Sequence, residues 1–112
     1  MKVQIRLRGI ESSPALVAHV RRRVRRHLRR FGADITAVVL RITDQNGPRG
    51  GPDKRYQLSV IGPRIGQVHL SEVHDDVHAG VDLALGRVGH AIGRQIERLR
   101  ELEAHGPAWS DS

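Results

Sequence analysis

The sequence predicts an α+β domain with the element order β-α-β-β-β-α: a four-stranded mixed sheet with two helices packed on one face. Four short stretches alternate apolar and polar residues, and two longer stretches repeat apolar residues at helical spacing. Each strand therefore has one apolar face, and both helices should cover that side of the sheet. A helix joins the first two strands, so these should be parallel with a right-handed crossover, whereas the later strands should form antiparallel hairpins.

The predicted strands are residues 2–8, 35–43, 55–61 and 67–73. Residues 44–53 are dense in glycine and proline and predict a flexible turn, and residues 62–66 predict a short hairpin loop. The side chains expected to face the helices are Val3, Ile5, Leu7, Val38, Leu40, Ile42, Tyr56, Leu58, Val60, Val68 and Leu70.

The first predicted helix runs from Pro14 to Phe31. Ser12 or Ser13 can cap its start, Pro14 suits its first position, and Gly32 is expected to end it as a C-terminal cap. Its apolar stripe is Leu16, Val17, Val20, Val24, Leu28 and Phe31.

The second predicted helix starts after a cap by Asp75 or Asp76 and ends near Ala104. Its buried stripe is Val77, Val81, Leu85, Val88, Ile92, Ile96 and Leu99. We therefore expect a single domain over residues 1–104, followed by a short disordered tail over residues 105–112.

Composition narrows the functional classes. The 112 residues contain no cysteine, which excludes disulfides and thiolate metal sites. No signal peptide or membrane-spanning stretch is evident, so we expect a cytoplasmic protein without a membrane partner. The formal net charge is +7, from 19 Lys and Arg against 12 Asp and Glu, and this favours a polyanionic partner such as nucleic acid. A GC-rich genome would explain arginine in place of lysine but not the excess of base over acid.

Arginine dominates the polar side of the first helix, where no Asp or Glu occurs between residues 14 and 31. Like charges one helical turn apart repel, so selection for stability alone would intersperse acids. Arginine can also grip phosphate oxygens with two hydrogen bonds. A second stripe on the last helix is expected to join the first around one groove. The predicted RNA-binding residues are Arg21, Arg22, Arg25, Arg26, Arg29, Arg30, Arg87, Arg94 and Arg98.

Other constellations are weaker. His74, Asp75, Asp76 and His78 resemble metal ligands, but helix capping explains both aspartates and no third ligand has suitable spacing. No nucleophile, triad or phosphate-cradling loop stands out, so we expect neither catalysis nor a cofactor, metal or small-molecule substrate. The basic residues of the open sheet face, Arg6, Arg8 and Arg41, are read as solvated, with RNA contact as the less favoured alternative.

Three segments carry a family resemblance. They are KVQIRLRGIESSPALVAHVRRRVRRHLRRF, KRYQLSVIGP and HLSEVHDDVHAGVDLALGRVGHAIGRQIERLR. In the third, an acidic pair follows a strand and leads into a helix that becomes basic. The matching positions are Asp75, Asp76, Val81, Asp82, Arg94 and Gln95. Over residues 2–103 the chain resembles the ribosome-associated inhibitor and hibernation-promoting factor family of bacteria, in its short form without a second, dimer-forming domain.

The resemblance implies a non-enzymatic protein that binds 16S rRNA of the small ribosomal subunit, in the channel for messenger and transfer RNA. Such a protein blocks translation in stress or stationary phase, and we expect a monomer. The alternative is a general binder of structured or double-stranded RNA outside the ribosome. Gly86, Gly89 and Gly93 depart from the family's usual Lys or Glu. They are expected opposite the buried stripe, where they reflect sequence drift or allow close approach of RNA or a subunit.

Overall fold

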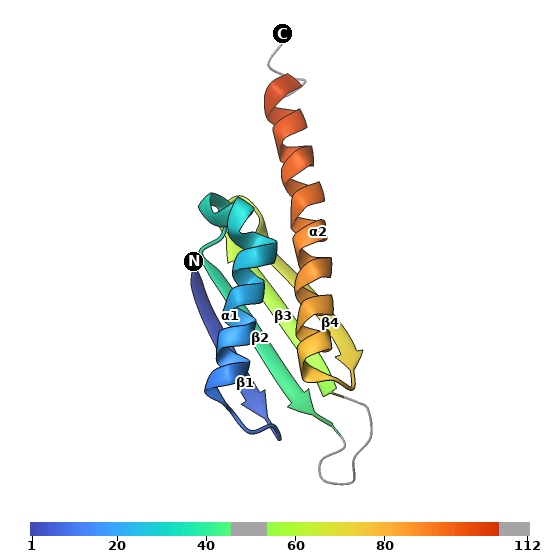
Figure 1. Ribbon diagram of the computed structural model, residues 1–112. Coiled ribbons are helices and arrows are strands. Elements are labelled where there is room, and N and C mark those ends of the chain that lie inside the picture. The colour runs from blue at the N-terminus through green and yellow to red at the C-terminus, as the bar shows by residue number, and fades with distance from the viewer. Residues whose placement is uncertain (46–53, 106–112) are drawn as a thin grey trace.

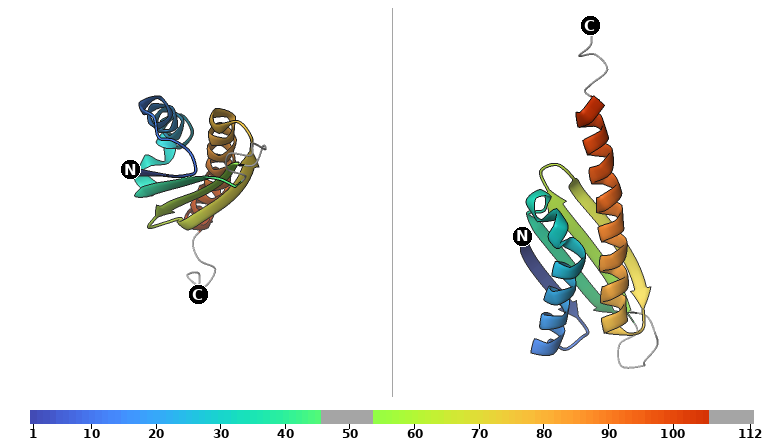
Figure 2. Two further views of the ribbon diagram at one scale, coloured as in Figure 1. Left: turned by 90° about the horizontal axis from the view of Figure 1, so that it is seen from below. Right: turned by 45° about the horizontal axis from the view of Figure 1, so that its top comes forward.

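The computed structural model describes residues 1–45 and 54–105. It confirms the predicted element order and places both helices on one face of a four-stranded sheet of order β1-β2-β3-β4 (Figures 1 and 2). The elements are β1 (Lys2–Arg8), α1 (Pro14–Leu28), the 3-10 helix η1 (Arg29–Asp34), β2 (Ala37–Asp44), β3 (Lys54–Gly62), β4 (Gly66–His74) and α2 (Val77–His105).

Strand pairing follows the prediction. β1 runs parallel to β2, with Val3 opposite Val38, and β3 pairs antiparallel with both of its neighbours. Each strand lies within two residues of its predicted bounds, and Gly66 adopts the positive φ of 67° that the tight turn between β3 and β4 requires. Most of the predicted turn over residues 44–53 lies outside the described residues, since only its first two positions are described.

The start of α1 is as predicted, but its end is not. The hydroxyl of Ser13 accepts a hydrogen bond of 3.1 Å from the Leu16 amide, and Pro14 occupies the first turn. At the other end, Gly32 has no left-handed conformation, and the chain continues past it as η1 to Asp34. The predicted glycine cap is therefore wrong: α1 tightens into a 3-10 helix instead of stopping.

The core lies between the sheet and the two helices. Val20 and Val24 of α1, Leu40 of β2, and Leu85 and Ile92 of α2 are all at most 1 % exposed. The apolar faces predicted for the strands and helices therefore meet, although β4 contributes only partly buried residues because it is an edge strand.

α2 begins at a polar junction. The carboxylate of Asp76 accepts a hydrogen bond of 3.1 Å from the Ala79 amide, which is the predicted capping role. The helix extends beyond the sheet (Figure 1) and ends at His105, one residue after the predicted end near Ala104. The expected tail lies, except for His105, outside the described residues. Within the described residues, no helix combines the length and apolarity needed to cross a bilayer.

Candidate nucleic-acid interface

The arginines of α1 and η1 line the solvent side of the helix from Arg21 to Arg30. At 100° per residue they cover an arc of about 200°. Within residues 1–45 and 54–105, none of the six predicted arginines of this region forms an ion pair with a carboxylate. The six, all exposed, are Arg21, Arg22, Arg25, Arg26, Arg29 and Arg30. We call this set the α1 arginine face.

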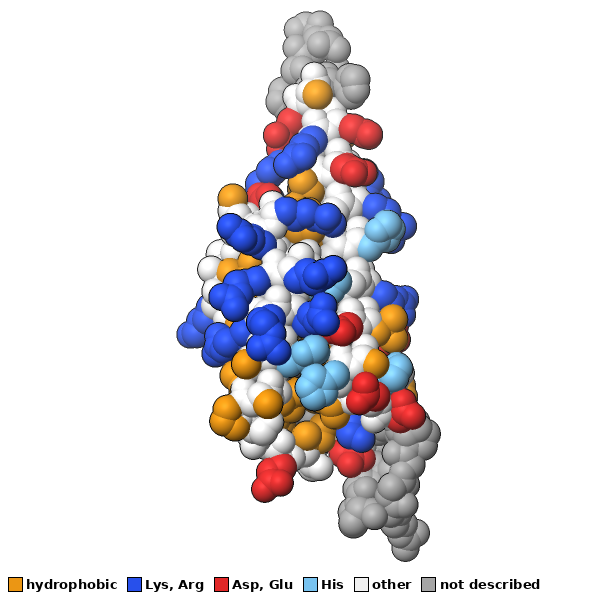
Figure 3. All heavy atoms as spheres, viewed as in Figure 1, with side chains coloured by type: hydrophobic (Ala, Val, Ile, Leu, Met, Phe, Trp, Pro, Cys, Tyr) orange, Lys and Arg blue, Asp and Glu red, His pale blue; other side chains and the backbone are white. Residues whose placement is uncertain are grey.

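The surface of the α1 arginine face is hollowed. An open depression of about 980 Å³ is lined by His19 and by every arginine from Arg22 to Arg30. A second hollow of about 570 Å³ lies toward β1, where Arg21 joins Met1 and Val3. Arg25 and Arg29 line both hollows, so the basic surface is continuous. Figure 3 shows Lys and Arg side chains gathered over α1 and beside α2.

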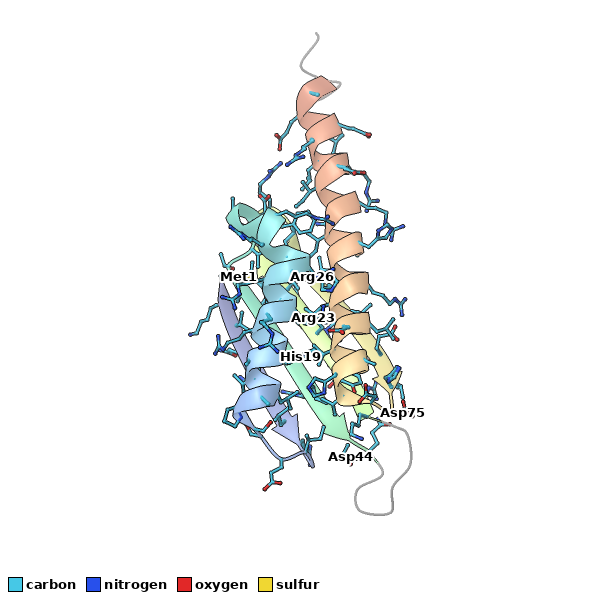
Figure 4. The ribbon with its side chains drawn as sticks, in the orientation of Figure 1. Met1, His19, Arg23, Arg26, Asp44 and Asp75 are labelled. Carbon is cyan, nitrogen blue, oxygen red and sulfur yellow. The ribbon has the colours of Figure 1, made fainter. Side chains whose placement is uncertain are left out.

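One arginine of the run differs from its neighbours. Arg23 Nε lies 3.0 Å from Asp82 Oδ1 of α2, and His19 Nε2 lies 3.3 Å from the same oxygen. His19 and Arg23 point from α1 toward α2 (Figure 4). Neither contact has hydrogen-bond geometry at that oxygen, so Arg23 and Asp82 attract each other as opposite charges rather than through a hydrogen bond. Asp82 therefore joins the two helices and neutralises Arg23, which was not among the predicted RNA-binding residues.

Arg30 and His27 lie where the α1 arginine face borders α2. The guanidinium of Arg30 lies 4.6 Å from the centroid of the Phe31 ring, a cation–π contact that restrains this arginine. Burial lowers the pKa of His27 below its usual 6.5; the Asp82 carboxylate opposes this shift, and the charges of Arg26, Arg23 and Arg30 add to it. A neutral His27 is consistent with its place among so many cations.

The glycines of α2 are not opposite the buried stripe, as the sequence had suggested, but face α1. A Cβ at Gly89 would lie 3.1 Å from the carbonyl oxygen of His27, and one at Gly93 would lie 3.4 Å from the Phe31 ring. At Gly86 the nearest atom would be a His27 ring carbon at 3.7 Å. These glycines therefore allow α2 to approach α1, and their predicted position opposite the buried stripe is wrong.

The second predicted stripe lies on the other flank of α2. Arg87 pairs with Glu72 of β4, which places it on the side away from α1. By helical spacing Arg94 and Arg98 follow on that flank, where they share a separate hollow of about 540 Å³ with Glu97 and Glu101. Arg87, Arg94 and Arg98 thus do not close one groove with the α1 arginine face.

The histidine–aspartate cluster is structural. The ring of His74 accepts a hydrogen bond of 3.0 Å from the Asp76 amide, while His78 packs edge-on against His19 with centroids 4.4 Å apart. Among residues 1–45 and 54–105, no three His, Asp or Glu side chains are arranged to hold a metal ion.

Sequence reasoning did not predict the contact made by Gln95, and it did not single out Arg100. Gln95 donates a hydrogen bond of 2.9 Å to the carbonyl of Ile65 and so ties α2 to the turn between β3 and β4. Arg100 lies seven residues after Gly93, so by helical spacing it is on the α1 side of α2, beyond the end of η1. That seven-residue spacing was the available signal for Arg100, but the side of α2 that contacts α1 had been assigned incorrectly.

Comparisons with known proteins agree with this architecture. The Thermus thermophilus Protein Y N-terminal domain superposes with a TM-score of 0.69 at 19 % identity, over 84 % of this chain and 98 % of that one. A ribosomal subunit interface protein from Coxiella burnetii gives a TM-score of 0.72 at 18 % identity, over 84 % and 96 % of the two chains. At these identities the likeness shows the fold.

A comparison with curated protein sequences gives no match. The sequence profile described as sigma 54 modulation protein / S30EA ribosomal protein, in contrast, matches residues 3–100, nearly the whole described chain. This chain therefore belongs to the sigma 54 modulation protein / S30EA ribosomal protein family.

Proposed function

We propose that this protein binds the small ribosomal subunit through the α1 arginine face and inhibits translation by occupying the channel of messenger and transfer RNA. Family membership supports association with the ribosome, and hence a cytoplasmic location. The observation that carries the choice of surface is the α1 arginine face, whose six arginines are exposed and, within the described residues, form no ion pair with a carboxylate.

The mechanism is steric and electrostatic rather than catalytic. Each guanidinium presents a planar fork of donors that matches a phosphate, and the gathered charge attracts a polyanion. Aromatic residues form only 3 % of the chain, and its one tyrosine is buried, so the protein contacts backbone rather than stacked bases. The family role that fits this chemistry is the storage of idle ribosomes in stress or stationary phase, by a monomer without a cofactor.

The proposed contacts differ in weight. The α1 arginine face carries the main contact, and Arg94 and Arg98 form a separate, smaller one on the outer flank of α2. Arg87, which the sequence placed with them, contributes less because Glu72 already neutralises it.

Equilibrium binding to purified bacterial small ribosomal subunits at several salt concentrations tests the proposal. Each phosphate contact contributes about 0.7–0.9 to the slope of log affinity against log salt. The triple variant Arg22→Gln/Arg26→Gln/Arg29→Gln should lower that slope by about 2–3 and abolish inhibition of translation in vitro.

A single-site pair supplies the matched control. Arg26→Gln should lower the slope by nearly one contact, whereas Arg23→Gln should change it much less, because Asp82 already neutralises Arg23. Unchanged binding by the folded triple variant would overturn the choice of surface. Competition by bulk duplex RNA as effective as competition by unlabelled subunits would favour the general RNA-binding alternative.

A further inference from the structure

The face of the sheet that the helices leave open is also basic. Strand alternation turns Arg6 and Arg8 of β1, Arg41 of β2 and Arg55 of β3 to the side away from α1 and α2. All four are exposed, and the left view in Figure 2, seen from below, shows both helices on the opposite face. No described strand presents Asp or Glu on this face, because Glu72 points inward to Arg87 and Asp44 alternates inward with Ile42.

The charges on this face are adjacent. Arg6 is the direct register partner of Arg41 on the parallel neighbouring strand. Like charges directly opposite each other destabilise a sheet, so this pairing has no benefit for the free protein. Arg41 in turn pairs with Gln57 of β3, which adds a neutral hydrogen-bonding group beside the two cations.

The same residues line a track across the sheet. A hollow of about 420 Å³ is bordered by Arg6, Arg8, Arg41, Thr43 and Gln57. A second hollow of about 160 Å³ continues from Arg41 and Gln57 to Ser59 and His69, whose side chains are joined by a hydrogen bond of 2.9 Å. Cationic and hydroxyl groups thus follow one another from β1 to β4, a width of about 14 Å at the usual strand spacing. Because Tyr56 is buried, this face has no Phe, Tyr or Trp side chain among the described residues.

We propose that the open sheet face is a second RNA-binding surface, which holds the phosphates of one RNA strand along the track from Arg6 and Arg8 through Arg41 to His69. The inference rests on the ribosome-binding function proposed above and extends it: with basic surfaces on both sides of the sheet, the protein binds between two RNA segments. The occupant is recognised by phosphate rather than by base, because the face offers guanidinium groups and no stacking platform.

Two charge-matched variants test this surface by binding to small ribosomal subunits at several salt concentrations. Arg6→Gln/Arg41→Gln removes two positive charges from the track and also removes the repulsive pair, so it should fold at least as well as the parent. Its affinity should fall about tenfold or more, with a salt slope smaller by about 1.5. The control Ser12→Glu/Ala15→Glu changes net charge equally at exposed positions near the start of α1, and it should bind within about twofold of the parent. Equal affinities and slopes for the two variants would overturn the inference.

Crosslinking separates this inference from the proposed function. The chain has no cysteine, so Ser71→Cys on the open face and Gly32→Cys beside the α1 arginine face each give one labelling site. Carrying a short photo-crosslinker, both should attach to rRNA, at different RNA segments. Crosslinks from position 32 alone would overturn the second surface and leave the first intact. Crosslinks from position 71 alone would support the sheet surface and contradict the α1 face, and crosslinks from neither would overturn both.

Discussion

Alanine at Gly86 and alanine at Gly89 should have opposite effects on stability, although the two glycines lie three residues apart on α2. Either substitution gains about 1 kcal/mol from the better helix propensity of alanine. At Gly86 the new methyl group would meet only a His27 ring carbon at 3.7 Å, an ordinary contact. The free energy of unfolding of Gly86→Ala should therefore rise by about 1 kcal/mol, which corresponds to about 4 °C in Tm for a chain of this length.

At Gly89 the methyl group would lie 3.1 Å from the backbone carbonyl oxygen of His27. A backbone oxygen in a helix cannot rotate away, so α1 and α2 would have to separate. Overpacking of this kind costs about 1–3 kcal/mol, which cancels or exceeds the gain in propensity. Gly89→Ala should therefore leave the free energy of unfolding unchanged or lower it by up to about 2 kcal/mol.

Urea denaturation followed by circular dichroism measures both differences, and a constant m-value shows that each variant unfolds from the same compact state. Stabilisation by both substitutions, or an equal loss from both, would refute the claim that the glycines set the distance between α1 and α2. Ribosome binding by Gly86→Ala should match that of the parent, because this substitution leaves the α1 arginine face in place.

Three further predictions concern polar side chains at the contacts between α1, α2 and the sheet. Asp82→Asn should lower the free energy of unfolding by less than about 1 kcal/mol, because the Asp82 side chain is 37 % exposed and its charge is screened by solvent. The same substitution should raise RNA affinity, because it leaves Arg23 without its carboxylate partner. Lower affinity would contradict the role given to this pair. Tyr56→Phe should cost about 1 kcal/mol, because the hydroxyl donates a hydrogen bond of 3.1 Å to the Asp76 carbonyl. Burial raises the pKa of Tyr56 to about 12, and the charges of Asp76 and Asp75 add to this shift. Titration followed by the absorbance of this single tyrosine should measure the raised pKa. Because the unfolded chain loses this proton first, the free energy of unfolding should fall as pH rises above 10.0. Burial lowers the pKa of His27 below 6.5, so just below that pH the unfolded chain binds more protons than the folded one. The free energy of unfolding, measured with urea, should therefore fall as pH drops below 6.5. His27→Gln should weaken this pH dependence.

The fold was predictable because each element carries its own periodic signal. In β1 and α2, the alternating or helical apolar pattern matches the residues that the core buries or partly buries. The end of α1 was not predictable in this way, because Gly32 is compatible with both a helix cap and a 3-10 turn. Packing of the Phe31 ring against Gly93, a contact between distant parts of the chain, belongs to the continued turn.

The candidate site was predictable only on α1. A run of arginines on one amphipathic helix shows its solvent side from the sequence alone, and six of these arginines are exposed as expected. Which flank of α2 faces α1 depends on the position of the helix over the sheet, which periodicity within α2 does not specify. Arg87, Gly89 and Gly93 were therefore assigned to the wrong sides, and the partners that settle the question, Glu72 and His27, lie far away in sequence.

Three of the positions that carry the family resemblance, Asp76, Asp82 and Gln95, hold elements of the fold together, whereas Arg94 is also proposed to bind RNA. The Asp76 carboxylate caps α2, and its backbone carbonyl accepts a hydrogen bond from the buried Tyr56 hydroxyl. Asp82 joins α2 to α1, and Gln95 ties α2 to the turn between β3 and β4. Each depends on one partner at a fixed distance, so its spacing along the chain is constrained and makes a recognisable pattern. A phosphate contact needs only a cation on the correct face of the protein, so an arginine one helical turn along the same face can make the same contact. These three positions therefore constrain how the elements pack, whereas the two RNA-binding surfaces that we propose depend on the charge on each side of the sheet.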